Sequence, residues 1–149
     1  IMGPGNPGFY QPTSIKALGK LAEYLMANAP WSNPKAPLTP KVAADYQKRF
    51  GDQLTTESAW AYQGVMVIAD ILERAGTTDP DKFVEAARSP NITNHIVAGG
   101  PIQFAENGDN LGASSAMVQI RNGLAKVIYP KPMAEIQAVY PIPKLWERG

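Results

Sequence analysis

An Asn-Gly pair stands between two runs of alternating apolar and polar residues, AMVQIR before it and LAKVIY after it. The tight turns that close β-hairpins require positive φ at both central residues, and Asn122-Gly123 adopts such values at little cost. Alternation with a period of two is typical of a strand that has one buried face. The pattern therefore predicts a β-hairpin over residues 116–129.

Three helices are predicted between residues 39 and 89, because local residues mark their starts and ends. Thr39-Pro40 offers a hydroxyl at the cap and a proline in the first turn, where a missing N–H costs nothing. The helix KVAADYQKRF follows and ends at Gly51. Asp79-Pro80 begins the helix DKFVEAARS by the same device.

The longest predicted helix covers about residues 57–75 and ends at Gly76. Its apolar residues recur three and four positions apart, which gathers them on one face. The residues on this face are Ala61, Tyr62, Val65, Ile68, Ala69 and Leu72. A helix with such a face typically packs it on a core.

The chain before the helices mixes loops with short elements. IMGPGNPGFYQP is typical of a short buried strand that runs into a loop. Thr13 or Ser14 can cap a short helix over SIKALG, with Gly19 past its end. The apolar run AEYLMANAPW predicts a buried strand, and SNPKAPLTP is a proline-rich connector.

The segment PIQFAENGDN alternates like a half-buried strand and then gathers acidic and amide side chains around one glycine. A calcium loop needs ligands at alternate positions and a Glu that closes a twelve-residue span. Here Glu106, Asn107, Asp109 and Asn110 are crowded, and no such Glu follows. Asn107-Gly108 suits a tight turn, so we predict a turn and no metal site.

Composition excludes several classes of protein. The chain has 149 residues, enough for about one domain, and its net charge is only +1, with no basic cluster that would indicate a nucleic-acid surface. The absence of cysteine excludes a disulfide scaffold, a thiolate metal site and a cysteine nucleophile. No signal peptide is visible, and the beginning IMGPG is typical of the middle of a protein, so we expect a longer chain.

No catalytic group stands out from the sequence. His95 is the single histidine, without an identifiable nucleophile or orienting acid, and is interpreted as a surface or loop residue. Ser114 and Ser115 lack the G-x-S-x-G frame. Glu57 and Trp60 near the start of the long helix have ordinary explanations, namely the helix dipole and the core.

The loop GPGNPG has two interpretations that stay open here. It is neither G-x-G-x-x-G nor a phosphate loop, and it serves either as a tight strand-to-helix connection or as a ligand-contacting loop with exposed backbone N–H groups. Phe9 and Tyr10 follow in this loop. Because loops lie on surfaces, these two aromatic residues are not readily explained as core.

The order of the motifs is specific. IMGPG, YQKRFG, ESAWAYQGVMVIADILERAGTTDPDKFVEAAR, GGPIQFAENGDN and AMVQIRNGLAKVIYP follow one another, and together they resemble the C-terminal part of the type 1 periplasmic solute-binding proteins of ABC transporters, branched-chain amino acid family. The family's usual Phe-Asp is replaced by Phe104-Ala105. The resemblance implies an α/β fold of two lobes joined by three crossovers, with ligand bound between them, in a chain of about 350 to 400 residues.

The resemblance also implies a division of this chain. Residues 1–28 would belong to the C-terminal lobe and residues 29–111 to the N-terminal lobe. Residues 112–149 would return to the C-terminal lobe and include the tail. The positions that match the family's ligand contacts, or extend its first loop towards the cleft, are Gly5, Asn6, Phe9, Tyr10 and Glu57. Gly5 and Asn6 stand where the family places an acid for the ligand's ammonium group, and Glu57 could supply that charge instead. Phe9 and Tyr10 could stack on an apolar or aromatic ligand.

The function implied by the resemblance is that of a solute-binding component of an ABC importer, without catalysis or cofactor. Its partners would be a small ligand, an amino acid or small carboxylate, and a membrane permease, and it would act as a periplasmic or lipid-anchored monomer whose precursor carries a signal peptide. Ligand would bridge the lobes only when they close, which shifts the population to the closed form. The alternative is a ligand-sensing regulator or receptor domain with the same fold.

Overall fold

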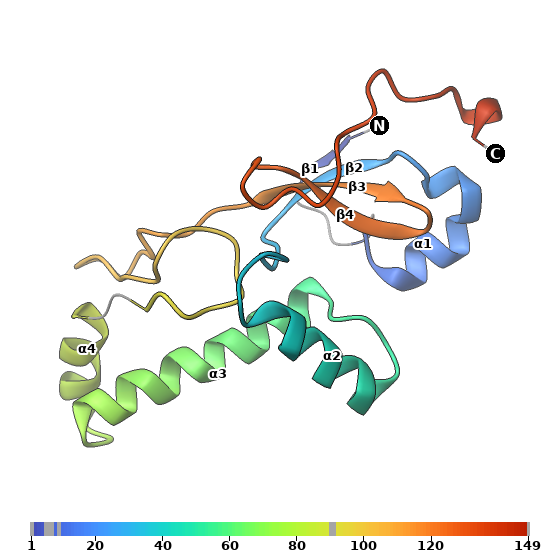
Figure 1. The fold of residues 1–149 in the computed structure, drawn as a ribbon. Coiled ribbons are helices and arrows are strands. Elements are labelled where there is room, and N and C mark those ends of the chain that lie inside the picture. The colour runs from blue at the N-terminus through green and yellow to red at the C-terminus, as the bar shows by residue number, and fades with distance from the viewer. Residues whose placement is uncertain (1, 5–7, 9, 90–91, 149) are drawn as a thin grey trace.

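The computed structural model of the chain describes residues 2–4, 8, 10–89 and 92–148. Three consecutive helices, α2, α3 and α4, separate the first two strands from the last two, and Figure 1 shows the sheet above these helices. The elements are β1 (Met2–Pro4), α1 (Pro12–Leu18), the 3-10 helix η2 (Gly19–Ala22), β2 (Met26–Ala29), α2 (Thr39–Phe50), α3 (Thr56–Ala75), α4 (Pro80–Arg88), β3 (Ala116–Arg121), β4 (Leu124–Tyr129) and the 3-10 helix η3 (Leu145–Glu147).

The four strands form one mixed sheet in the order β1-β2-β3-β4. β1 and β2 are parallel, whereas β3 is antiparallel to both β2 and β4. The predicted hairpin is confirmed, because Asn122 and Gly123 turn the chain with φ of 54° and 74°. The predicted strand at AEYLMANAPW is confirmed over Met26–Ala29, which form β2, and two of these residues, Ala27 and Ala29, are buried.

We call residues 2–29 and 116–148 the sheet half and residues 33–111 the helical half, in each case the described residues of those ranges. The main hydrophobic core belongs to the sheet half, with Ala98 added from the other half. Its members are Tyr10, Ile15, Ala22, Leu25, Ala27, Ala29, Ala98, Ala116, Val118, Ile120, Val127 and Met133. α1 contributes Ile15, so this helix packs on the sheet.

The tail after β4 contains no long element, as its prolines predict. The tail is fixed to the sheet at two places. Glu135 exchanges hydrogen bonds with the main chain of Val127 in β4, and the main chain of Val139 meets the buried side chain of Gln119 in β3. The Gln119 Oε1 accepts from the Val139 N–H at 3.0 Å, and its Nε2 donates to the Val139 carbonyl at 3.1 Å. The Arg148 guanidinium adds a further attachment by donating to the Leu21 carbonyl.

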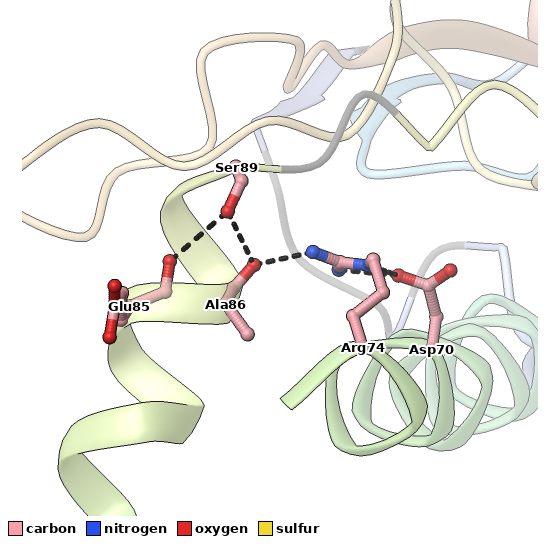
Figure 2. A network of polar contacts seen from close by, with 5 residues as sticks. All are labelled: Asp70, Arg74, Glu85, Ala86 and Ser89. Carbon is pink, nitrogen blue, oxygen red and sulfur yellow. Dashed lines mark hydrogen bonds and ion pairs between the residues drawn. The ribbon is translucent and has the colours of Figure 1, made fainter. Parts of the chain in front are cut away.

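The helical half ends its helices as the sequence predicts. Gly51 and Gly76 follow α2 and α3 in the left-handed conformation, and the Asp79 side chain accepts from the first N–H groups of α4. Figure 2 shows how α4 is attached to α3. Arg74 of α3 pairs with Asp70 and also donates to the Ala86 carbonyl near the end of α4.

Two predicted caps are wrong. Thr39 is the first residue of α2 rather than its cap, and its hydroxyl donates to the Asn33 carbonyl at 2.6 Å. α1 begins at Pro12, before Thr13 and Ser14, with Gln11 at the cap position and no side-chain cap bond. Proline presets the helical φ at the first helical position, so this helix starts without a hydroxyl.

The predicted apolar face of α3 is not buried among the described residues. Val65 and Ile68 are 66% and 51% exposed, whereas the buried positions are Thr56, Ala59, Gln63 and Ile71. α3 packs its opposite side on the segment that contains Ile96, whose N–H donates to the Gln63 side chain at 3.0 Å. The neighbours supplied by this chain therefore decide which face is covered, against the helix's own apolar periodicity.

The predicted strand at PIQFAENGD is reduced to single bridges, Ile92 with Ile102 and Phe104 with Asn110. The chain turns too soon after Phe104 to continue a ladder. The turn itself is confirmed, since the Ala105 N–H donates to the Asp109 carbonyl at 2.8 Å and Gly108 has φ of 89°. No helix in the described ranges has the length and apolar character that crossing a membrane requires.

Residues 30–32 and 112–115 are the crossings between the halves, and they lie close to a third segment. Ser32 bridges Val97, and Gly99 bridges Ala113. The main chains approach so closely that a Cβ added at Gly112 would lie 1.9 Å from the Pro101 carbonyl oxygen. The crossings therefore depend on a residue without a side chain.

Candidate functional site

A cavity of about 640 Å³ lies between α1–η2, the hairpin turn and the chain that leads into α3. Its walls come from residues 10–24, from residues 52–57, from residues 122–125 and from Trp31 in the first crossing. Both halves of the chain thus contribute to one concave surface. A concave surface between two parts of a fold is a common place for a small-molecule site.

Tyr10 lines this cavity and also belongs to the core. Its side chain is only 5% exposed, and its ring meets Trp31 edge-on with the centroids 5.2 Å apart. The expectation that Tyr10 lies in a surface loop outside the core is therefore wrong. The residue lies two positions before α1, and its ring belongs to the main core that also holds Ile15 of that helix.

The phenol of Tyr10 is held in its neutral form. Burial raises its pKa, and the carboxylate of Glu57 raises it further by charge repulsion, while the Thr56 side chain acts in the opposite direction. A neutral phenol retains its proton and can donate a hydrogen bond. Thr56 itself is buried, and its hydroxyl has no partner of full hydrogen-bond geometry.

Glu57 reaches the same cavity from the first turn of α3. Thr55 caps this helix by accepting from the Ser58 N–H at 3.2 Å, which leaves the Glu57 side chain free for other contacts. The Nε2 of Gln11 donates to Glu57 Oε1 at 3.3 Å. Glu57 is exposed, so a charged solute can reach its carboxylate.

Three of the five predicted site residues, Gly5, Asn6 and Phe9, lie outside the described residues. The structure brings the other two, Tyr10 and Glu57, to one cavity although 46 residues separate them in the chain. Their joint presence does not test whether either binds a ligand. Their assignment as ligand contacts stays a prediction.

Sequence reasoning missed the residues that surround this pair. Gln11, Lys16, Lys20 and Trp31 all line the cavity. The spacing of the two lysines gives no helical signal, because Lys16 lies in α1 and Lys20 in η2, with Gly19 ending α1 between them. Nothing in the sequence alone pairs Gln11 with Glu57.

Glu23 is a further residue that the sequence did not single out. Its two carboxylate oxygens accept from the N–H groups of Asn122 and Gly123, at 3.0 and 2.6 Å. This contact fixes the hairpin turn at the rim of the cavity. The next residue, Tyr24, has φ of 64° and places its ring 5.0 Å from the guanidinium of Arg121.

The two walls of the cavity carry different charges. α1 and η2 present Lys16 and Lys20, with Glu23 occupied by the hairpin turn, whereas the approach to α3 presents Asp52 and Glu57. None of these five residues takes part in the ion pairs found within the described ranges. The cavity thus offers both a basic and an acidic wall to a solute.

The residues considered for catalysis do not meet in this cavity. His95 is a loop residue, but it is buried rather than on the surface, and it is not among the residues that line the cavity. Ser114 donates to the carbonyl of its neighbour Ser115. Across the residues that the structure describes, no three His, Asp or Glu side chains are grouped so as to hold a metal ion.

Comparison with known families identifies the class of protein. The periplasmic binding protein family model matches residues 4–125, and the chain belongs to that family. The mixed sheet, the flanking helices and the two crossings agree with part of a type 1 periplasmic-binding-protein fold. No curated protein matches the chain in a sequence comparison.

Among solved structures, the chain is similar to substrate-binding proteins of ABC transporters. A leucine-binding protein from Thermotoga maritima is 27% identical with a TM-score of 0.68, and the match covers 85% of this chain and 35% of that one. A Desulfitobacterium hafniense ABC transporter substrate-binding protein solved with Leu is 20% identical with a TM-score of 0.61, over 78% and 38% of the two chains. A Rhodopseudomonas palustris ABC-type branched-chain amino acid transporter is 18% identical with a TM-score of 0.61, over 85% and 33%.

The matched structures are larger than this chain. The chain spans about a third of the length of each of these three proteins. Below 25% identity the likeness concerns the fold alone, which applies to the second and third. The matched proteins are substrate-binding proteins and transporters rather than enzymes.

Proposed function

We propose that this chain is part of the solute-binding component of an ABC importer. It would bind an amino acid, or a related small carboxylate or aromatic solute, outside the cytoplasm and deliver it to a membrane permease. The family supports this assignment, as does the description of the matched proteins as leucine-binding or branched-chain amino acid transport proteins.

The observation that carries the proposal is the cavity between the two halves. It brings Tyr10 and Glu57, from different halves, to one surface of the size that small solutes occupy. We assign residues 1–28 and 112–149 to the C-terminal lobe and residues 29–111 to the N-terminal lobe. The crossings between them then serve as hinges.

The proposed mechanism requires no covalent chemistry. A solute that touches both walls makes its full set of contacts only when the lobes are closed, and this differential affinity shifts the population towards closure. Glu57 would hold a cationic group of the solute, because its carboxylate is exposed at the cavity and its Oε2 is left free by Gln11. The edge-on pair Tyr10 and Trp31 would form the apolar floor.

Isothermal titration of the full-length protein with a panel of branched-chain and aromatic amino acids, amines and dicarboxylates tests this function. Saturable binding of at least one solute is expected. Glu57→Gln should weaken an amine-bearing solute about tenfold or more, because a charge-assisted hydrogen bond is worth on the order of 1.5–3 kcal/mol. A solute without a cationic group should bind as tightly as before or more tightly.

Glu73→Gln is the matched control, since Glu73 is exposed on α3 outside the cavity. It should leave every Kd unchanged. If no solute of the panel binds the parent protein, the solute-binding function is wrong for these classes of ligand. If the parent binds an amine-bearing solute and Glu57→Gln leaves its Kd unchanged, Glu57 is not in the site.

A further inference from the structure

The hydrogen bond between Gln11 and Glu57 has an unusual place in the molecule. Gln11 belongs to the sheet half and Glu57 to the helical half, and both line the cavity between them. Another side-chain hydrogen bond lies at a crossing, where Trp60 Nε1 donates to the Pro30 carbonyl. Within the described ranges, Gln11–Glu57 is the side-chain hydrogen bond that spans the cavity itself.

Neither partner needs this bond for its own helix. Gln11 stands at the cap position of α1, but its side chain makes no cap bond. Glu57 lies in the first turn of α3, where Thr55 already supplies the cap. The bond therefore does nothing for either helix, and its consequence is to hold the two walls together.

We propose that Gln11 and Glu57 form a cross-cavity link that favours the closed arrangement before any solute binds. The proposal rests on the proposed two-lobed function. The donor is a neutral amide and the acceptor a carboxylate, and the bond uses only Oε1, so the second oxygen stays available to a solute. The link and a bound solute can therefore coexist, and the link lowers the work of closure for any solute.

The link has a defined and modest strength. The bond is exposed and rather long at 3.3 Å, so the ratio of closed to open molecules should change by about two- to fivefold when it is removed. Gln11→Glu should lower the ratio further, because two carboxylates would then face each other across the cavity. An exchange of the two side chains, Gln11→Glu with Glu57→Gln, restores an amide–carboxylate bond with its direction reversed.

The test is a distance measurement on the solute-free, full-length protein. Spin labels attached at Lys131→Cys and Glu73→Cys report on the two halves, since both positions are exposed and this chain has no cysteine of its own. Pulsed electron–electron double resonance then gives the fractions of molecules with short and with long distances between the two labels. Gln53→Ala is the matched control, because Gln53 lines the same cavity and its side chain makes no hydrogen bond with the described residues.

We expect the closed fraction to fall in Gln11→Ala, to fall further in Gln11→Glu, to recover in the exchanged double variant and to stay at the parental value in Gln53→Ala. The proposal is overturned if Gln11→Ala matches Gln53→Ala, or if the exchange fails to recover the closed fraction. Because no solute is present, this result is independent of the titration. A protein that binds no tested solute can still show the link, and one that binds well can lack it.

Discussion

In the sheet half Ile120 is 2% exposed and Val118 is 0% exposed, whereas in the helical half Ile68 of α3 is 51% exposed. All three are aliphatic residues within regular elements. The sheet half covers its apolar residues with its own helix and strands. The helical half covers only one side of α3, so a pattern that is typical of core packing meets solvent in the described part of the chain.

The comparison teaches that residues of this chain bury the apolar side chains of the sheet half but not those on the apolar face of α3. Burial of an aliphatic side chain contributes roughly 1.5–3 kcal/mol, and the exposed side chains of α3 do not make this contribution to stability. The match covers 85% of this chain but only 35% and 33% of two of the matched structures, which are therefore much longer. Substitutions in the two halves should therefore have unequal costs.

The largest expected effect is at Ile120. Ile120→Ala should cost about 2–5 kcal/mol in the free energy of unfolding of the 149-residue chain, because it removes buried methylenes and leaves a cavity. Ile68→Ala should cost less than about 0.5 kcal/mol in the same chain. Denaturant titration followed by circular dichroism measures both. Equal costs would mean that the two halves are covered alike in solution.

The next largest effect is at the crossings. Gly112→Ala should destabilise by about 2 kcal/mol or more, because its Cβ would lie 1.9 Å from a carbonyl oxygen and the main chains would have to separate. Gly100→Ala is the control, since the nearest atom to its Cβ would be 3.9 Å away. Similar melting temperatures for the two variants would contradict the close approach.

A smaller effect is expected inside the helical half. Gln63→Ala removes the acceptor of the Ile96 N–H and leaves that donor buried, which costs about 1–3 kcal/mol. Amide hydrogen exchange should show faster exchange at Ile96. Gln103→Ala, at an exposed position, should change neither the stability nor the exchange at Ile96. Unchanged protection at Ile96 in Gln63→Ala would mean that another group accepts this hydrogen bond.

The smallest effect concerns Tyr10 at high pH. Its pKa is raised in the folded chain, so above pH 10 the unfolded chain loses the proton first and stability falls as the pH rises towards the folded value. Tyr10→Phe keeps the ring and should remove this part of the decline. Unfolding titrations between about pH 8 and 11, a window around the ordinary tyrosine pKa, compare the two proteins. Parallel curves would show that Tyr10 titrates normally.

The sequence predicted the features that are decided locally. Gly51, Gly76 and Asp79 end or begin helices because of their own backbone and side-chain chemistry, and Asn122-Gly123 closes the hairpin for the same reason. The burial of Tyr10 and the exposed face of α3 depend on neighbours far away in the chain. These features could not be read from periodicity or from loop composition.

The candidate site was only partly predictable. A resemblance to a family placed Tyr10 and Glu57 near a cleft, and the structure brings them to one cavity. The partners Gln11 and Trp31 were missed because their roles arise from tertiary contact alone. The predicted cap of α1 was wrong because the helix begins at Pro12, before the hydroxyl residues that were expected to cap it.

The contact between Gln119 and Val139 allows the length of the tail to vary. The Gln119 amide makes the two bonds with Val139 that a neighbouring strand would make at a single rung of a ladder. Glu135 is bonded to Val127 of β4, so the chain between Glu135 and Val139 is a short loop with an attachment at each end, and lengthening such a loop twofold costs only about 0.6 kcal/mol. Insertions and deletions on either side of Val139 should accumulate among natural variants, while the amide at 119 and the spacing of its own strand persist.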